Sequence, residues 1–187
     1  LSKNAIPGEV YTNLLESVNK GLDPMHGWIK RKAEILGVEK IKPFDMYVSL
    51  FEEKEAKKYS FDEAYEIILE AFRPMGSNYT EAVREIYKER RIDVHETAGK
   101  RSGAYSSGAA FGFKPYILMN WNGLLNDVFT LAHEIGHNIH SLYAGSTQPY
   151  IYADYTIFLA EIASTFNEAL LFDFLIKKAD TAGKKQL

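Results

Sequence analysis

The spacing of apolar positions along the chain predicts a mostly helical protein. Apolar residues recur every three or four positions in several stretches, which we expect to be helices. These stretches are 9–36, interrupted near Gly21 and Pro24, then 60–72, 80–91, 126–143 and 156–178. Ser60 should cap the second stretch, with Glu63 at the capping-box position, and Gly145 should close the fourth.

Between the third and fourth helical stretches, the pattern changes to short β-forming runs around glycines. Two strands are expected near 103–107 and 115–121, joined by a glycine-rich turn. An apolar run at 43–51 predicts a short strand or an extended connector, and the mixed charges of 52–58 predict a solvated loop. The expected fold class is therefore mainly α with a small β-sheet.

Composition narrows the kinds of function that need to be considered. The 187 residues are 46% hydrophobic and 25% charged, which is typical of one globular domain with a sizeable core. A net charge of −3 with no basic stripe gives no reason to expect nucleic acid. No apolar run approaches the roughly 18 to 20 residues of a membrane-spanning helix, so no membrane partner is expected. The absence of cysteine excludes disulfides and thiolate metal sites.

Three of the five histidines lie within the stretch LAHEIGHNIHSL, residues 131–142. A helix turns about 100° and rises about 1.5 Å per residue, so His133 and His137 lie on one face, about 6 Å apart along the axis. Two imidazoles at this separation can reach one metal ion at roughly 2.0 to 2.1 Å. Glu134 projects beside the ion, where it can take a proton from water, as in the H-E-x-x-H arrangement of zinc proteases.

A catalytic zinc site usually has a third protein ligand. The pattern H-E-x-x-H-x-x-G-x-x-H is excluded, because the sequence has His140 where glycine is needed and Tyr143 where histidine is needed. The remaining arrangement takes a glutamate from a following helix. Glu161 and Glu168 both lie on the final predicted helix, on one face. Spacing favours Glu161 as the ligand and Glu168 as the partner of a ligand histidine's far nitrogen, and leaves the reverse assignment open.

Further candidates for the site have ordinary structural alternatives. His140 faces the same side as the other two histidines and could support a ligand or contact substrate, with core packing as the alternative. The strand SGAYS, with Gly103, Ala104 and Tyr105, could pair with a peptide backbone as an added strand, or be an ordinary sheet edge. Tyr152 could line a cleft between the two ligand-bearing helices, as could its neighbours Tyr150 and Tyr155, with packing as the alternative.

Three stretches together resemble oligoendopeptidase F, within the M3 metallopeptidases. They are LAHEIGHNIHS, QPYIYADYTIFLAEIASTFNEALL and GKRSGAYSSGAAFGFKPYILMNW. The glutamate in AEIAST makes the resemblance specific, because H-E-x-x-H alone is shared by many families. The resemblance implies a zincin-like core and a cytoplasmic zinc endopeptidase that cleaves short peptides. By motif position, it implies one Zn²⁺ per chain held by His133, His137 and Glu161, with Glu134 as general base.

Members of this family are much longer, and a C-terminal region supplies tyrosine and histidine side chains that hold the substrate carbonyl. We therefore expect residues 1–187 to be a single partial domain, the catalytic segment of a longer peptidase. On its own it should bind zinc but hydrolyse peptides weakly or not at all, and its exposed surface could self-associate. The alternative is a non-catalytic helical interaction module whose motif holds a structural or adventitious metal.

Overall fold

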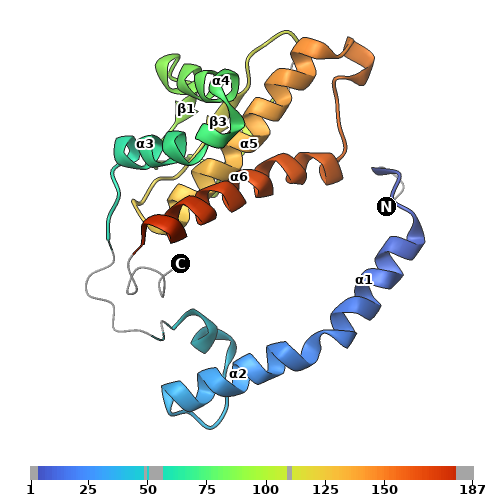
Figure 1. The fold of residues 1–187 in the computed structure, drawn as a ribbon, viewed down its shortest axis with the longest axis vertical. Helices are drawn as coiled ribbons and strands as arrows, with labels where there is room; N and C mark the ends of the chain where they lie inside the picture. Colours follow the sequence, from blue (N-terminus) through green and yellow to red (C-terminus); the bar gives the residue numbers. More distant parts are fainter. Residues whose placement is uncertain (1–3, 49, 51–56, 109–110, 180–187) are drawn as a thin grey trace. The chain divides into compact units, whose positions relative to one another are not determined.

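The computed structural model describes residues 4–48, 50, 57–108 and 111–179. Within these residues, six α-helices and one three-stranded sheet confirm the predicted fold class (Figure 1). The chain divides into two compact units, Leu1–Glu55 and Ala56–Leu187. Two compact units can belong to one domain, so the single partial domain stays a prediction. None of the described helices is long and apolar enough to cross a lipid bilayer.

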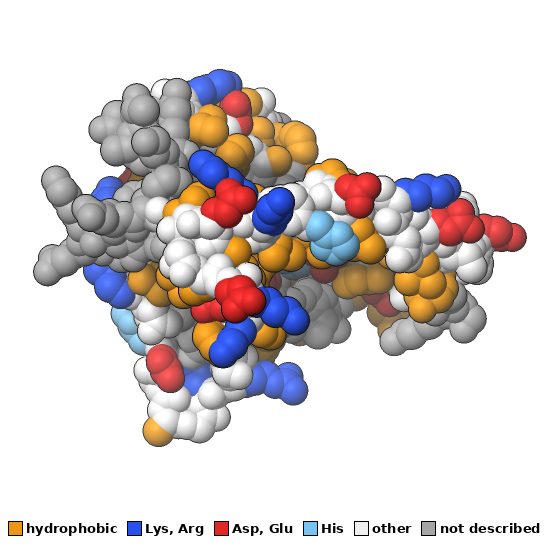
Figure 2. All heavy atoms as spheres, turned by 90° about the horizontal axis from the view of Figure 1, so that it is seen from below, with side chains coloured by type: hydrophobic (Ala, Val, Ile, Leu, Met, Phe, Trp, Pro, Cys, Tyr) orange, Lys and Arg blue, Asp and Glu red, His pale blue; other side chains and the backbone are white. Residues whose placement is uncertain are grey.

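The first unit contains α1 (Gly8–Lys20) and α2 (Leu22–Leu36). The two helices are separated at Gly21, which confirms the predicted interruption. Pro24 lies in the first turn of α2, where its missing N–H leaves no helical hydrogen bond unmade. Apolar side chains of both helices remain exposed, and Figure 2 shows such side chains among charges of both signs on one face of the molecule.

Residues Pro43–Tyr47 form the short 3-10 helix η2, so the strand or extended connector predicted over 43–51 is wrong for this part. The fixed φ of Pro43 suits the first position of a helical turn. The carboxylate of Asp45 also accepts a hydrogen bond from the backbone N–H of Lys42 at 2.7 Å, which closes the turn. Residues 49 and 51–56 lie outside the described residues. Of the predicted loop at 52–58, only the last two residues are described, and both are exposed and irregular.

The second unit opens with α3 (Phe61–Ala71), η3 (Arg73–Met75) and α4 (Ser77–Lys88). The hydroxyl of Ser60 accepts a hydrogen bond from the backbone N–H of Glu63 at 3.1 Å, which confirms the predicted cap. The helix predicted over 80–91 starts and ends earlier than expected. Gly76, with a φ of +88°, ends the preceding turn and lets α4 begin at once, and the chain beyond α4 soon joins the sheet.

The sheet has the strand order β1-β3-β2, with β1 at Ile92–Asp93, β2 at Tyr105–Ser107 and β3 at Tyr116–Leu118. Strand β3 runs parallel to β1 and antiparallel to β2. The two strands predicted near 103–107 and 115–121 are confirmed, in shorter form. Strand β1 was not predicted, because two residues are too few to show an alternating pattern. Strand β2 forms one edge of the sheet.

The histidine-bearing helix α5 spans Leu125–Thr147 and runs past its predicted end. The prediction that Gly145 closes this helix is wrong, because Gly145 is itself helical. The helix ends at Gln148, whose backbone is extended, since the following Pro149 disfavours a helical conformation there. After the 3-10 helix η4 (Tyr150–Tyr152), α6 spans Ile157–Lys178, which confirms the last predicted helix.

Helix α5 lies at the centre of the second unit and contacts α3, α4, β2, β3 and α6. Its buried apolar side chains join those of the neighbouring elements in one core. Large members of this core include Tyr65, Ile68, Phe72, Val83, Ile86, Ile117, Met119, Val128, Leu131, Ile135, Ile139 and Leu171. One side of α5 is therefore anchored in the core, and another packs along α6.

Candidate metal centre

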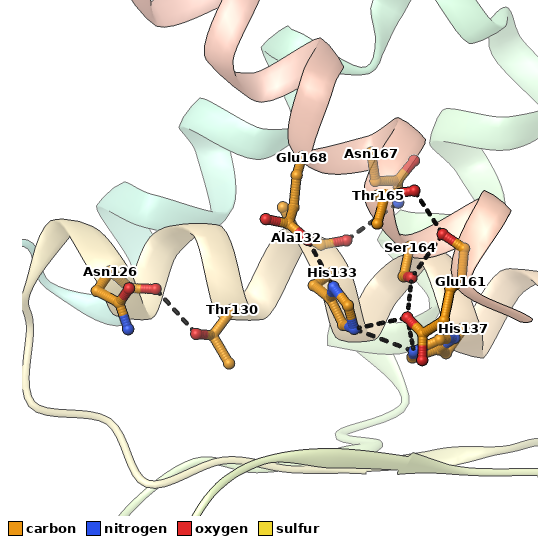
Figure 3. A network of polar contacts seen from close by, with 10 residues as sticks. All are labelled: Asn126, Thr130, Ala132, His133, His137, Glu161, Ser164, Thr165, Asn167 and Glu168. Atoms are coloured by element: carbon orange, nitrogen blue, oxygen red, sulfur yellow. Dashed lines mark hydrogen bonds and ion pairs between the residues drawn. The ribbon is translucent and has the colours of Figure 1, made fainter. Parts of the chain in front are cut away.

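Two helices bring three metal-donor side chains together: His133 and His137 from α5, and Glu161 from α6 (Figure 3). The Nε2 atoms of the two histidines lie 3.1 Å apart. The Oε2 atom of Glu161 lies 3.5 Å from Nε2 of His133 and 3.6 Å from Nε2 of His137. These three residues form a group that could hold one metal ion.

The spacing of the donor atoms fits a tetrahedral zinc ion. Donors that each bind such an ion at roughly 2.0 to 2.1 Å lie about 3.3 to 3.4 Å from one another. The separations of 3.1, 3.5 and 3.6 Å lie on either side of this value. Two imidazoles and one carboxylate are donor types that catalytic zinc accepts, and three protein ligands leave a fourth position open. The residues present therefore fit zinc.

Glu168 of α6 determines which nitrogen of His133 faces the other donors. The Nδ1 atom of His133 lies 2.6 Å from Oε1 of Glu168 (Figure 3). An ionised carboxylate can only accept a hydrogen bond, so Nδ1 carries the proton and Nε2 presents its lone pair. This is the contact that the sequence led us to expect of Glu168. Its part in supporting a metal ligand stays a prediction.

Glu161 is held on α6 by its neighbour one turn away. The hydroxyl of Ser164 donates to Oε2 of Glu161 at 2.8 Å, and Ser164 is fully buried. At this level the two helices approach closely at Gly136 of α5. A Cβ atom added to Gly136 would lie 2.7 Å from the carbonyl oxygen of Ala163 and 2.7 Å from Cα of Ser164. The missing side chain of Gly136 thus allows the close packing that brings Glu161 to the histidines.

A buried amide joins the same two helices further along. The Nδ2 atom of Asn167 on α6 donates to the carbonyl oxygen of Ala132 on α5 at 3.1 Å. Its Oδ1 atom accepts a hydrogen bond from the hydroxyl of Tyr79 on α4 at 2.9 Å. Ala132 directly precedes His133, and Asn167 directly precedes Glu168. The hydrogen bond between Asn167 and Ala132 therefore holds the two helices together next to the contact between His133 and Glu168.

Glu134 is not one of the three donors, and its environment differs from theirs. Its side chain is buried against β2. Burial raises the pKa of Glu134, whereas His133 and a backbone hydrogen bond from Ser106 lower it, and the charge of Glu161 raises it. The Oε2 atom of Glu134 has no hydrogen-bond partner among the described residues. A buried carboxylate with one unpaired oxygen, next to a group of candidate metal donors, is suited to accept a proton from a molecule bound at those donors.

His140 lies outside the donor group. Its ring stacks on Tyr155 with the ring centroids 3.9 Å apart and the planes 16° from parallel. Burial lowers the pKa of His140, and it also lowers that of His137, which favours the neutral imidazoles. The stack shows that His140 packs against the segment after α5. It leaves open whether the ring also supports a ligand or contacts substrate.

The tentative substrate residues lie at the sheet edge and in the segment after α5. Gly103 has a φ of +85° and its carbonyl oxygen accepts a hydrogen bond from Asn120, which anchors the start of β2. Ala104 packs against the core, and Tyr105 on β2 is exposed. A cavity of about 880 Å³ lies between β2, the end of α5 and the segment 150–155. Its lining includes Tyr150 and Tyr155 but not Tyr152, which is exposed.

Three buried polar residues around the site were missed by the sequence analysis: Arg91, Asn138 and Asn167. Their exposed fractions are 2%, 0% and 1%. Asn138 lies one helical turn after Glu134, and Asn167 adjoins a candidate glutamate, so their places on the two candidate helices were an available signal. Arg91 gave no such signal, because a charged residue just beyond a helix is normally exposed.

Comparison with known proteins agrees with the geometry. Residues 1–187 match the model described as Peptidase family M3. Oligopeptidase PepF of Bacillus subtilis is 43% identical over 180 residues, which cover 96% of this chain and 27% of that protein. Group B oligopeptidase PepB of Streptococcus agalactiae is 42% identical over 178 residues, which cover 95% of this chain and 29% of that protein.

A solved structure shares the fold as well. A protein of Chlamydophila abortus assigned as a peptidase has a TM-score of 0.79 and 38% identity, with 97% of this chain and 30% of that chain covered. This chain thus spans less than a third of the length of these relatives. The family match extends over the whole chain, and it confirms the resemblance inferred from the three sequence stretches. The chain belongs to peptidase family M3.

Proposed function

We propose that this chain carries the metal site and the general base of a zinc endopeptidase that cleaves short peptides. The observation that carries the proposal is the meeting of His133, His137 and Glu161, with the buried carboxylate of Glu134 beside them. The relatives that are 43% and 42% identical are both named oligopeptidases, which supports peptides as the substrate class. In this proposal the chain is one catalytic segment of a longer protein.

His133 and His137 would bind zinc through Nε2, and Glu161 would bind it through its carboxylate. When bound, zinc would supply positive charge that polarises the peptide carbonyl and makes a water molecule acidic enough to react near neutral pH. Glu168 would keep His133 in the tautomer that presents Nε2. Ser164 would hold the carboxylate of Glu161 in place.

Glu134 would move the proton. Its free Oε2 would accept a proton from the attacking water, and the protonated side chain would then donate to the leaving amine. Burial raises the pKa of this carboxyl, which makes it a stronger proton acceptor than an exposed glutamate.

The peptide substrate would lie along the free edge of β2. Ile117 of β3 donates its backbone N–H to Arg91, on the side of β1, and Ser106 of β2 lies directly opposite Ile117. In an antiparallel pair, the backbone N–H and C=O groups of two directly opposite residues either point toward each other or both point away from the partner strand. Those of Ile117 point toward β1, so those of Ser106 point away from β3. Ser106 and Ala104, two residues apart, therefore both direct their backbone groups to the free edge. The N–H of Ser106 meets the carboxylate of Glu134 there, which leaves the C=O of Ser106 and the N–H and C=O of Ala104 for a peptide. Main-chain pairing there would accept peptides of varied sequence.

The test of this function is Glu134→Gln in a full-length protein that contains this chain. Glutamine keeps the size of the side chain but cannot take the proton, so we expect cleavage to fall by at least about 10²-fold with zinc retained. Hydrolysis of a quenched fluorescent peptide and zinc content by mass spectrometry are the two measurements. Unchanged cleavage would rule out Glu134 as the base. Zinc binding without cleavage in the wild type would favour the alternative, an interaction module with a structural metal.

Cytoplasmic location, the count of one zinc ion per chain and self-association of the isolated chain stay predictions from the sequence.

A further inference from the structure

A chain of mostly buried polar groups connects Arg91, which lies between α4 and β1, to β2. The Nη1 atom of Arg91 donates to the carbonyl oxygen of Pro115 at 2.7 Å and to Oδ1 of Asn138 at 3.0 Å. The Nδ2 atom of Asn138 then donates to the hydroxyl of Ser106 at 3.3 Å. Arg91 is 2% exposed and Asn138 is fully buried. The network thus joins the segment between α4 and β1 to α5, to β2 and to the residue before β3, through the buried side chains of Arg91 and Asn138 and the partly buried Ser106.

Burial of the guanidinium of Arg91 needs an explanation. Its charge is met by one ion pair, from Nε to Oε2 of Glu89 at 3.0 Å, and Glu89 is itself partly exposed. The Nη2 atom has no hydrogen-bond partner among the described residues. An apolar side chain of similar size often stabilises a core as well as a buried ion pair does. A buried guanidinium can instead hold neighbouring elements in one arrangement, because its hydrogen bonds are directional.

The network ends at Ser106, which also lies next to the proposed general base, Glu134. Glu134 and Asn138 lie one turn apart on the same face of α5. Asn138 donates a hydrogen bond to the side chain of Ser106, and the backbone of Ser106 lies next to the carboxylate of Glu134. Ser106 lies in the middle of β2, whose free edge is the proposed substrate edge. The point at which Ser106 is held along α5 therefore sets where the free edge of β2 lies relative to Glu134.

We propose that Arg91 and Asn138 are positioning residues, which hold β2 at Ser106 so that a peptide along the strand presents its carbonyl group beside Glu134. This inference rests on the proposed function, because it assigns both residues to the same reaction. It adds that the sheet edge and the base are aligned by a buried network that involves none of the three metal donors.

The activity test is Asn138→Ala in the zinc-loaded full-length protein. A misplacement of about 1 Å can cost about 10²-fold in rate, so we expect kcat to fall by at least about tenfold with zinc content unchanged. The matched control is Tyr65→Phe, which removes a buried hydroxyl that donates to the carbonyl of Val83, away from β2. The control should lower the melting temperature but leave kcat unchanged. Equal kcat in the two variants would overturn the inference, as would loss of zinc from Asn138→Ala.

A milder pair of variants keeps the test decisive if Asn138→Ala does not fold. Ser106→Ala removes the hydroxyl that accepts from Asn138, whereas Ser106→Thr keeps a hydroxyl and suits a strand. We expect Ser106→Ala to lose kcat and Ser106→Thr to retain more of it. Equal loss in both variants would count against the network.

Amide hydrogen exchange gives a readout that does not depend on activity. Asn138→Ala should speed exchange in residues 105–107 relative to the other strands, whereas Tyr65→Phe should not change this ratio. An unchanged ratio in Asn138→Ala would overturn the inference. If the wild-type protein cleaves no peptide, the proposed function fails, and the exchange ratio still decides whether the network positions β2.

Discussion

Three glutamates near the histidines have different surroundings, and these surroundings separate their roles. Glu161 faces the Nε2 atoms of both histidines, whereas Glu168 meets only the Nδ1 atom of His133. Glu134 is buried against β2 and keeps one oxygen without a partner. These different neighbours are the basis for the proposed roles of ligand for Glu161, ligand support for Glu168 and base for Glu134.

At this scale, the first prediction compares Glu161→Ala with Glu168→Ala. Loss of a residue that supports a ligand typically weakens metal binding by about 10- to 100-fold, which we expect for Glu168→Ala. Glu161→Ala should weaken zinc binding further, because it removes a ligand. Competition with a chromophoric chelator would measure both affinities on the purified chain. A larger loss in Glu168→Ala than in Glu161→Ala would reverse the two assignments.

A second prediction concerns the close approach of the two helices at Gly136. In Gly136→Ala the new Cβ would meet the backbone of Ala163 and Ser164 at 2.7 Å, so α6 must move away. We expect a loss of about 1 to 3 kcal/mol in the free energy of unfolding and weaker zinc binding.

The matched control for this prediction is Gly145→Ala on the same helix, where a Cβ would meet nothing within 4 Å. It should be neutral or stabilising, since alanine favours helix over glycine by about 1 kcal/mol. Urea denaturation and chelator competition compare the two variants. Equal effects would show that the spacing at Gly136 does not matter.

At the level of the helices and strands, α5 carries two of the three candidate donors and the proposed base, and it contacts several neighbouring elements. Its apolar side chains lie in the core, and it packs along α6, which carries the third donor. The edge strand β2 lies against the same helix. Helix α5 therefore sets the positions of both Glu161 on α6 and the edge strand β2 relative to the two histidines.

The prediction at this scale is that Ala104→Pro raises the KM of the full-length protein for peptides. Proline removes the backbone N–H that faces the free edge, and a bound peptide would lose that hydrogen bond. We expect an increase of about 2- to 10-fold in KM, the range for one hydrogen bond of about 0.5 to 1.5 kcal/mol. Ala104→Ser, which keeps the N–H, is the control. Steady-state kinetics that are unchanged by proline would argue against substrate pairing at β2.

At the scale of the whole molecule, this chain matches less than a third of each of the relatives compared. Its three metal donors and Glu134 are nevertheless all contained in the second unit, Ala56–Leu187. The proposed metal site is therefore formed by contacts within the described part of this unit. Stabilisation of the negative charge on the substrate oxygen normally needs a further donor, for which the proposed mechanism assigns no residue of this chain.

We therefore predict that the purified 187-residue chain binds zinc but cleaves peptides at least about 10²-fold more slowly than a full-length protein that contains it. One missing donor to the oxyanion typically accounts for a loss of this size. Zinc titration and peptide hydrolysis, measured side by side on both proteins, check the prediction. Equal turnover would mean that this chain supplies every group that the reaction needs.

Much of the fold could be predicted because it depends on local pattern. The apolar spacing predicted the long helices, and Ser60 with Glu63 predicted where α3 begins. The errors also have local causes. Two residues were too few to predict β1, and Pro149, not Gly145, determined where α5 ends.

The placement of His133 and His137 on one face of a helix could be predicted from the sequence, because helical periodicity follows from the backbone alone. The sequence left Glu161 and Glu168 as two candidates on one face of a second helix. The position of Glu161 opposite both Nε2 atoms could be found only from the packing of the two helices, because that distance depends on how closely α6 approaches α5 at Gly136. The proposed alignment of β2 with Glu134 likewise depends on tertiary structure, since the hydrogen bonds of Arg91 and Asn138 join segments far apart in sequence.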